Sequence, residues 1–177
     1  MAKLPEKYVV DTNVPITANR ALDPAAIADE LVDCVLTCVE AIEQVVFQGG
    51  IVLDQGDEIF DEYRRELRMQ GQPGVGDRFI KWVHDNRWSL PDSDRVVIIK
   101  NDDSYDELRA HDDLIHFDRS DRKFVAVANA HLQKPPILQA TDSKWWGWQA
   151  ALHEVGITVH FVCPEYAQAK YAEKFGD

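Results

Sequence analysis

Two aspartates follow short apolar runs directly, and they are the residues from which a chemical hypothesis starts. Asp11 ends the run Tyr8-Val9-Val10, and Asp142 ends the run that begins at Ile137. An acid in that place lies at the carboxyl end of a predicted strand, where open α/β sheets build their sites. Two further acids, Glu62 and Asp121, stand near the amino-terminal ends of predicted helices. We expect the four carboxylates to converge on one rim of a sheet.

Carboxylates held a few Å apart raise each other's pKa and destabilise a fold unless a cation neutralises them. An acid cluster without matching arginines therefore suggests a divalent metal ion, and ligation by oxygen alone points to Mg²⁺ or Mn²⁺. The alternative for Asp11 and Asp142 is a helix cap, because an aspartate after a strand often caps the next helix. The joint occurrence of four such acids favours the metal site.

The elements that must position these acids alternate between strand and helix patterns. The predicted strands are 8–10, 51–54, 95–100, 137–142 and 157–162, and the predicted helices are 13–20, 24–48, 59–67, 79–88, 105–111, 124–132, 145–155 and 164–175. Parallel strands need helical crossovers, so this alternation predicts a mainly parallel sheet with helices on both faces. No internal repeat or linker interrupts the pattern, which favours a single domain over residues 1–177.

The composition limits which partners and which cellular compartment we expect. The chain has 31 Asp and Glu against 19 Lys and Arg, a net charge of -12, and therefore repels nucleic acid and anionic membranes at long range. Any binding of nucleic acid must then be local. The first residues have no apolar signal-peptide core, and no apolar run approaches the roughly 18 residues of a membrane span. We expect a soluble cytoplasmic protein without a membrane partner.

Three cysteines, Cys34, Cys38 and Cys163, form no C-x-x-C pair. Cys34 and Cys38 are one helical turn apart on an apolar stripe. We predict three buried free thiols, in preference to a zinc site or a disulfide.

Four motifs in their order along the chain together resemble those of the PIN domain family. They are Val-Val-Asp11-Thr-Asn13, Glu62 within Asp-Glu-Tyr-Arg-Arg-Glu-Leu, Ser120-Asp121-Arg-Lys-Phe-Val-Ala-Val-Ala128, and Ala-Thr141-Asp142. The resemblance covers Tyr8 to about Val162. It implies a three-layer α/β/α sandwich around a five-stranded sheet of order 3-2-1-4-5. It also implies a ribonuclease that depends on Mg²⁺ or Mn²⁺, in which the metal activates water for in-line displacement at phosphorus.

Carried over to this chain, the family pattern makes Asp11, Glu62, Asp121 and Asp142 the catalytic acids, as metal ligands or their orienting partners. Thr12, Asn13 and Thr141 would hydrogen-bond to the ligating carboxylates and orient them.

Two further acids leave alternatives open. Glu58 lies one turn before Glu62 and is the alternative second acid, while Glu40 is expected to be a solvent-facing helix residue. Asp118, three residues before Asp121, is equally a fifth acid of the site or a helix cap.

Basic and aromatic residues flank the acids. Arg119, Arg122, Lys123 and Lys144 are the candidates for binding substrate phosphates, although surface solubility explains them equally well. Trp145, Trp146 and Trp148 could stack unpaired bases, but we favour helix packing or an oligomer contact for them.

The leading hypothesis is a metal-dependent endoribonuclease acting on single-stranded or loop RNA. A catalytically inactive PIN-like scaffold that binds a protein is the alternative, and clustered unpaired carboxylates argue against it. A phosphoryl-transfer enzyme with Asp11 as nucleophile ranks last, because Asn13 stands where a second acid is needed. The resemblance leaves open a homodimer, and a protein inhibitor or antitoxin as partner.

Overall fold

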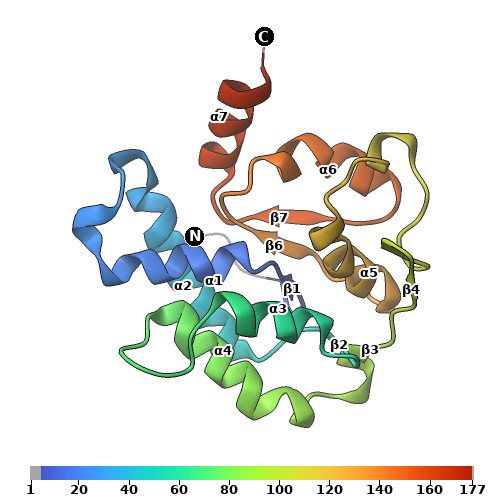
Figure 1. Cartoon of the computed structure of the whole chain (residues 1–177), viewed down its shortest axis with the longest axis horizontal. Coiled ribbons are helices and arrows are strands. Elements are labelled where there is room, and N and C mark those ends of the chain that lie inside the picture. Colours follow the sequence, from blue (N-terminus) through green and yellow to red (C-terminus); the bar gives the residue numbers. More distant parts are fainter. Residues whose placement is uncertain (1–4, 177) are drawn as a thin grey trace.

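The computed structural model describes residues 5–176 and shows a mixed α/β fold with short parallel strands (Figure 1). Strands β1 (Val9–Val10), β6 (Ile137–Gln139) and β7 (Val159–Phe161) form a parallel sheet in the order β1-β6-β7. Strands β2 (Leu53–Asp54) and β3 (Arg95–Val96) form a second parallel pair. A single parallel bridge joins Tyr8 to Ile51. The expected five-stranded sheet is not found among the described residues, because strands of two or three residues leave the two sheets joined by that bridge alone.

The helices agree well with their sequence patterns. They are α1 (Asn13–Asn19), α2 (Val32–Gln48), α3 (Glu58–Glu66), α4 (Val75–Asn86), α5 (Arg122–Ala130), α6 (Lys144–Glu154) and α7 (Pro164–Phe175). Short 3₁₀ turns cover Arg20–Leu22, Pro24–Ala26, Asp29–Leu31, Arg87–Ser89, Asp92–Asp94, Asp112–Leu114 and Arg119–Asp121. Gly49 ends α2 in the left-handed conformation that glycine adopts readily, at φ 69°.

The prediction of one helix over 24–48 was wrong for its first third. Ile27 and Ala28 have extended backbones, with ψ of 124° and 141°, and helical hydrogen bonds cannot continue through them. Two 3₁₀ turns take the place of the helix there. They let Ile27 pack against the hydrophobic core from an irregular segment before α2 begins.

The prediction for 95–111 was also wrong in part, since the expected strand 95–100 ends at Val96. The chain then forms an antiparallel hairpin of β4 (Lys100–Asn101) and β5 (Ser104–Tyr105), which turns at Asp102 with φ 53°. The expected helix over 105–111 is absent. The Glu107 carboxylate accepts the Ile99 N–H at 3.0 Å, so it closes the hairpin instead of capping a helix.

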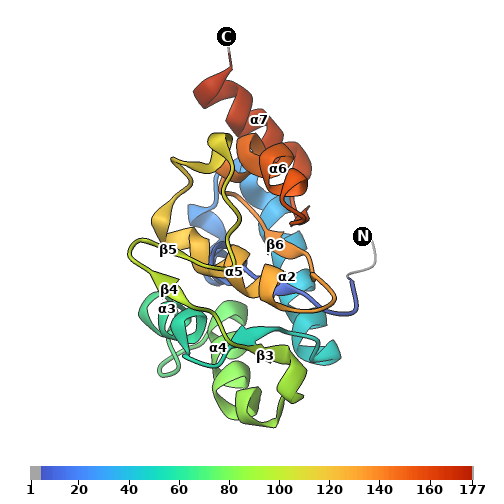
Figure 2. The ribbon, with the colours of Figure 1, turned by 90° about the vertical axis from the view of Figure 1, so that its right-hand side faces the viewer.

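The core lies between the short strands and the helices on them. Helix α5 contacts β1 and β6, α6 contacts β7, and α1, α2 and α4 pack on one another. Helix α7 projects from one end of the molecule in both ribbon views (Figures 1 and 2). Ala167 is the single buried residue within α7, so few apolar contacts hold this helix. Among the described residues, no helix is long and apolar enough to cross a membrane.

A disulfide joins Cys34 of α2 to Cys163, the residue before α7, with the two Cα atoms 5.4 Å apart. The prediction of three free thiols was therefore wrong for this pair and is confirmed for Cys38, which is buried and free. The pairing joins residues 129 apart in sequence. Spacing could not reveal it, because the return of the chain after β7 brings Cys163 to α2.

Candidate active site

The end of β1 places Asp11 inside the protein, with 5% of its surface exposed. The backbone N–H of Asn13 donates to Asp11 Oδ1 at 2.9 Å and fixes the carboxylate just beyond the strand. The Asn13 side chain in turn accepts the Thr141 N–H at 2.6 Å and donates to the Thr141 hydroxyl at 2.9 Å. Asn13 and Thr141 thus join the ends of β1 and β6, the neighbouring strands after which Asp11 and Asp142 stand.

Asp121 and Asp142 approach from α5 and β6. Asp121 ends the 3₁₀ turn before α5, and its Oδ2 accepts the indole N–H of Trp145 at 3.2 Å. Asp142 follows β6, and its Oδ1 accepts the Lys144 N–H at 3.2 Å. Asp142 therefore does make the cap-like contact that was its alternative interpretation, and this contact uses one of its two oxygens.

The four acids share one electrostatic environment. Burial raises the pKa of Asp11 well above its usual range, and the negative charges of Asp121, Glu62 and Asp142 raise it further, against the opposing Asn13 N–H. Burial raises the pKa of Asp121 to about 7, and Asp142, Asp118 and Glu62 add to this shift. The fold thus brings together the four acids that the motifs singled out.

Glu62 differs from the other three because it has its own counter-charge. Lys123 Nζ lies 2.7 Å from Glu62 Oε1, and the Thr12 hydroxyl donates to Oε2. Both oxygens of Glu62 are therefore engaged within the protein. Lys123 is only 8% exposed, so it is not the surface phosphate ligand that we expected. It neutralises one acid of the cluster.

The other three acids each keep one oxygen without a hydrogen bond to any described residue: Asp11 Oδ2, Asp121 Oδ1 and Asp142 Oδ2. This all-oxygen set with uncompensated negative charge suits Mg²⁺ or Mn²⁺. The arrangement is open. Within residues 5–176, no three carboxylates bring oxygens within 4.8 Å of one another. A metal bound by these acids would therefore need water or substrate oxygens to complete its coordination, as Mg²⁺ usually does.

The alternative acids serve the structure around the site. Glu58 Oε1 accepts the Tyr105 hydroxyl at 3.0 Å and faces the β4-β5 hairpin, which favours Glu62 as the second acid. Asp118 accepts the N–H and hydroxyl of Ser120 at 3.3 and 3.1 Å, so it caps the turn that carries Asp121. The cap interpretation is therefore confirmed. The charge of Asp118 also raises the pKa of Asp121, and the role of a fifth site acid stays a prediction. Glu40 is exposed on α2, as expected.

Of the predicted phosphate-binding residues, Arg119 and Lys144 remain at the surface, with side chains 74% and 53% exposed. Arg119 lies 3.1 Å from Asp103, and Lys144 lies 3.8 Å from Asp118. The Arg122 guanidinium has a structural role, since it donates to backbone carbonyls of Asp103, Ile115 and Phe117.

The tryptophans divide between the core and the surface. Trp145 is fully buried, and Trp146 packs on Phe161 with ring centroids 5.1 Å apart. Trp148 meets Phe117 edge-on at 4.8 Å and is partly exposed. Packing is therefore the role of the first two, as expected.

Sequence reasoning missed three supporting contacts of the site. These are the Lys123–Glu62 pair, the indole of Trp145 on Asp121, and the Tyr63 hydroxyl, which donates to the Val10 carbonyl at 2.5 Å beside Asp11. One signal was present in the sequence. Lys123 opens an otherwise apolar helical run, and a lysine in such a place is buried only with a partner.

No protein-family model, curated protein or solved structure matches this chain.

Proposed function

We propose that this protein is a metal-dependent endoribonuclease of the PIN type, which hydrolyses RNA phosphodiester bonds with Mg²⁺ or Mn²⁺. The observation that carries the proposal is the buried Asp11 carboxylate, surrounded by Asp121, Glu62 and Asp142, of which Glu62 alone pairs with a described cation. Such a concentration of uncompensated acid destabilises a fold unless it has a use. Binding a divalent cation is the use that all-oxygen donors favour.

The side chains of the proposed site would have distinct roles. Asp11, Asp121 and Asp142 would hold the cation through the three oxygens that have no described hydrogen-bond donor. When bound, the cation would supply a water of lowered pKa and a positive charge against the reacting phosphate. The Asn13–Thr141 bonds keep Asp11 and Asp142 in register, and Trp145 orients Asp121. Lys123 pairs with Glu62 beside them.

The arrangement of strands supports the same proposal. The bridge from Tyr8 to Ile51 joins the residue before β1 to the segment that leads into β2. Taken with the pairs β2-β3, β1-β6 and β6-β7, it supports the lateral order 3-2-1-4-5 that the resemblance implies, although these strands do not form one five-stranded sheet. In that order Asp11 follows the central strand and Asp142 follows its neighbour.

The direct test incubates purified protein with end-labelled single-stranded and structured RNAs in Mn²⁺, Mg²⁺ or a chelator. We expect internal cleavage with metal and none with chelator. Asp11→Asn and Asp142→Asn should each reduce the rate by more than about 100-fold, because even the loss of an outer partner of a metal site commonly reduces affinity or activity 10–100-fold.

Asp61→Asn is the matched control, since Asp61 precedes Glu62 on α3 and its side chain is 54% exposed. It should cleave like the unchanged protein. Cleavage that survives the chelator or Asp11→Asn would rule out the metal mechanism. If no RNA is cleaved under any condition, the inactive scaffold becomes the better proposal.

A further inference from the structure

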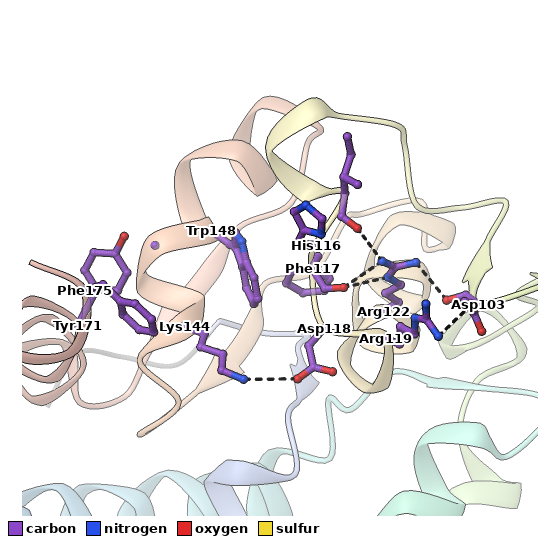
Figure 3. Close-up of a pocket in the computed structure, with 12 residues that line it drawn as sticks. Asp103, His116, Phe117, Asp118, Arg119, Arg122, Lys144, Trp148, Tyr171 and Phe175 are labelled. Carbon is purple, nitrogen blue, oxygen red and sulfur yellow. Dashed lines mark hydrogen bonds and ion pairs between the residues drawn. The ribbon is translucent and has the colours of Figure 1, made fainter.

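A cavity of about 790 Å³ opens between α6, α7 and the segment before α5 (Figure 3). Its size lies within the usual range for small-molecule sites, about 300–1,000 Å³. It is lined by aromatic side chains on two sides and by charged side chains on a third, and none of the contacts described above accounts for it.

The aromatic walls come from α6, α7 and the segment before α5. Phe117 and Trp148 form one wall, and Tyr171 and Phe175 from α7 form the other, with the centroids of the last two rings 5.2 Å apart. Phe175 is 55% exposed although it is a large apolar residue. Aromatic faces open to a cavity are suited to stacking planar rings, and base stacking does not depend on a particular sequence.

Gly147 sets the distance between α6 and the α7 wall. A Cβ added at Gly147 would lie 2.5 Å from the Tyr171 ring, so any larger residue must push that ring away. The tip of a tyrosine side chain can move at little expense to the fold. Gly147→Ala therefore disturbs the cavity without removing an aromatic group.

The rim of the cavity carries two cations. Lys144 and Arg119 line the cavity with exposed side chains, and Asp118 lines it as well. Lys144 is two residues from Asp142, and the charge of Asp118 reaches Asp121. The cavity and the acids are therefore neighbours, with the two cations on the cavity rim. Asp118 and Asp103 lie beside these cations and oppose a highly charged ligand, which favours one phosphate group over several.

We propose that this cavity binds one nucleotide of the RNA, with its base between Trp148 and the Tyr171–Phe175 wall and its phosphate at Lys144 and Arg119. The identity of the ligand rests on the proposed nuclease function. A ring held here would fix the position of the adjoining phosphodiester relative to Asp11, Asp121 and Asp142. The cavity would thus determine which phosphodiester bond of an unpaired strand is cut.

The test measures the binding of four nucleoside 5′-monophosphates and of ribose 5-phosphate in chelator, by calorimetry with unchanged protein. We expect the nucleotides to bind and ribose 5-phosphate, which lacks a base, to bind at least about 10-fold more weakly. Trp148→Ala and Tyr171→Ala should each weaken nucleotide binding about 5- to 100-fold, the range for loss of one stacking contact. Gly147→Ala should weaken it too, and Lys144→Ala should lower affinity for nucleotide and ribose phosphate alike.

Trp88→Ala is the matched control, because Trp88 is 62% exposed and lies outside the cavity. Equal binding of nucleotides and ribose 5-phosphate, no binding of any nucleotide, or unchanged affinity in both Tyr171→Ala and Gly147→Ala would overturn the proposal. The binding test and the RNA cleavage test can fail independently. Base-dependent nucleotide binding by the unchanged protein, together with no cleavage of any RNA in Mg²⁺ or Mn²⁺, would rule out the nuclease and keep the cavity proposal, while cleavage without base-dependent binding would do the reverse.

Discussion

At the scale of single residues, the acids of the site differ in whether a cation compensates their negative charge. Glu62 is paired with Lys123 and hydrogen-bonded to Thr12, whereas Asp11 has a backbone N–H alone. The Lys123 and Glu62 side chains are only 10% and 15% exposed, so their attraction is weakly screened by solvent. The charge balance of the cluster therefore depends on one lysine.

Lys123→Met should destabilise the protein by about 3 kcal/mol, because it leaves the Glu62 carboxylate nearly buried without its counter-charge. Denaturant unfolding measures the change. The double variant Lys123→Met with Glu62→Gln should recover part of the loss, since the unpaired charge is then gone. Lys81→Met is the control, because its pair with Asp85 is exposed and should contribute less than about 1 kcal/mol. Equal losses for the two lysines would contradict this role of Lys123.

The pH dependence of the metal-free protein should report Asp121. Its pKa is about 7 in the fold and about 4 in the unfolded chain, so the fold favours the protonated form. This contribution to stability is complete below about pH 4 and is lost as the pH rises to about 7. Asp121→Asn should therefore flatten the fall in melting temperature between pH 5 and pH 8 in chelator.

Added Mg²⁺ should raise the melting temperature of the unchanged protein at pH 8 and have little effect on Asp121→Asn, since a ligand stabilises only the state that binds it. Asp61→Asn, an exposed acid, should follow the unchanged protein at every pH. Parallel pH profiles for the unchanged protein and Asp121→Asn would show that Asp121 does not titrate in this range.

At the scale of elements, α7 has fewer buried residues than any other α-helix in the described part of the chain. It buries Ala167 alone along its length, and a disulfide at Cys163 ties its start to α2. The same helix supplies Tyr171 and Phe175 to the cavity. The bond between α2 and the start of α7 should therefore influence both stability and the shape of the cavity wall.

Cys34→Ser should lower the free energy of unfolding by about 2–4 kcal/mol, the usual range for a disulfide that closes a long loop. It should also weaken nucleotide binding, because the α7 wall is then less restrained. A reducing agent should produce both effects in the unchanged protein and no further effect in Cys34→Ser. If the reducing agent weakens the variant as well, its action lies elsewhere.

At the scale of the whole molecule, the net charge of -12 opposes RNA at a distance and leaves only local attraction at the site. Arg119 and Lys144 are the two exposed cations that line the cavity. Arg122 lines it too, but its guanidinium is engaged with backbone carbonyls. We therefore expect RNA binding to depend on salt less steeply than in a protein with an extended basic surface.

In single-stranded nucleic acid each neutralised phosphate contributes about -0.7 to the slope of log affinity against log salt, so the one phosphate held by Lys144 and Arg119 predicts a slope of about -0.7. Lys144→Ala should bring the slope closer to zero. The measurement uses Asp11→Asn with short single-stranded RNA, so that cleavage does not interfere. A slope several times steeper would place the RNA on a different surface.

Several features could be predicted from sequence because local patterns determine them. Helix α7 was predicted over its full length, from the proline that opens it onward. Asn13 and Thr141 were predicted to hydrogen-bond to the ligating carboxylates. Their side chains bond to each other's residue instead, because parallel pairing brings the ends of β1 and β6 together. The turns before α2 were missed because Ile27 packs against the core from an irregular segment. The hairpin after β3 was missed because the Glu107 carboxylate accepts the N–H of Ile99, eight residues earlier.

The sequence by itself determined that acids stand beyond the ends of two strands and at the start of helices, because strand and helix periodicity decides where each run ends. Only the tertiary structure decided that Lys123 turns inward to Glu62, that Cys34 meets Cys163, and that α7 closes a cavity beside the acids. Each of these contacts joins residues from elements far apart in the chain. Their partners are chosen by how the elements pack, which no local pattern records.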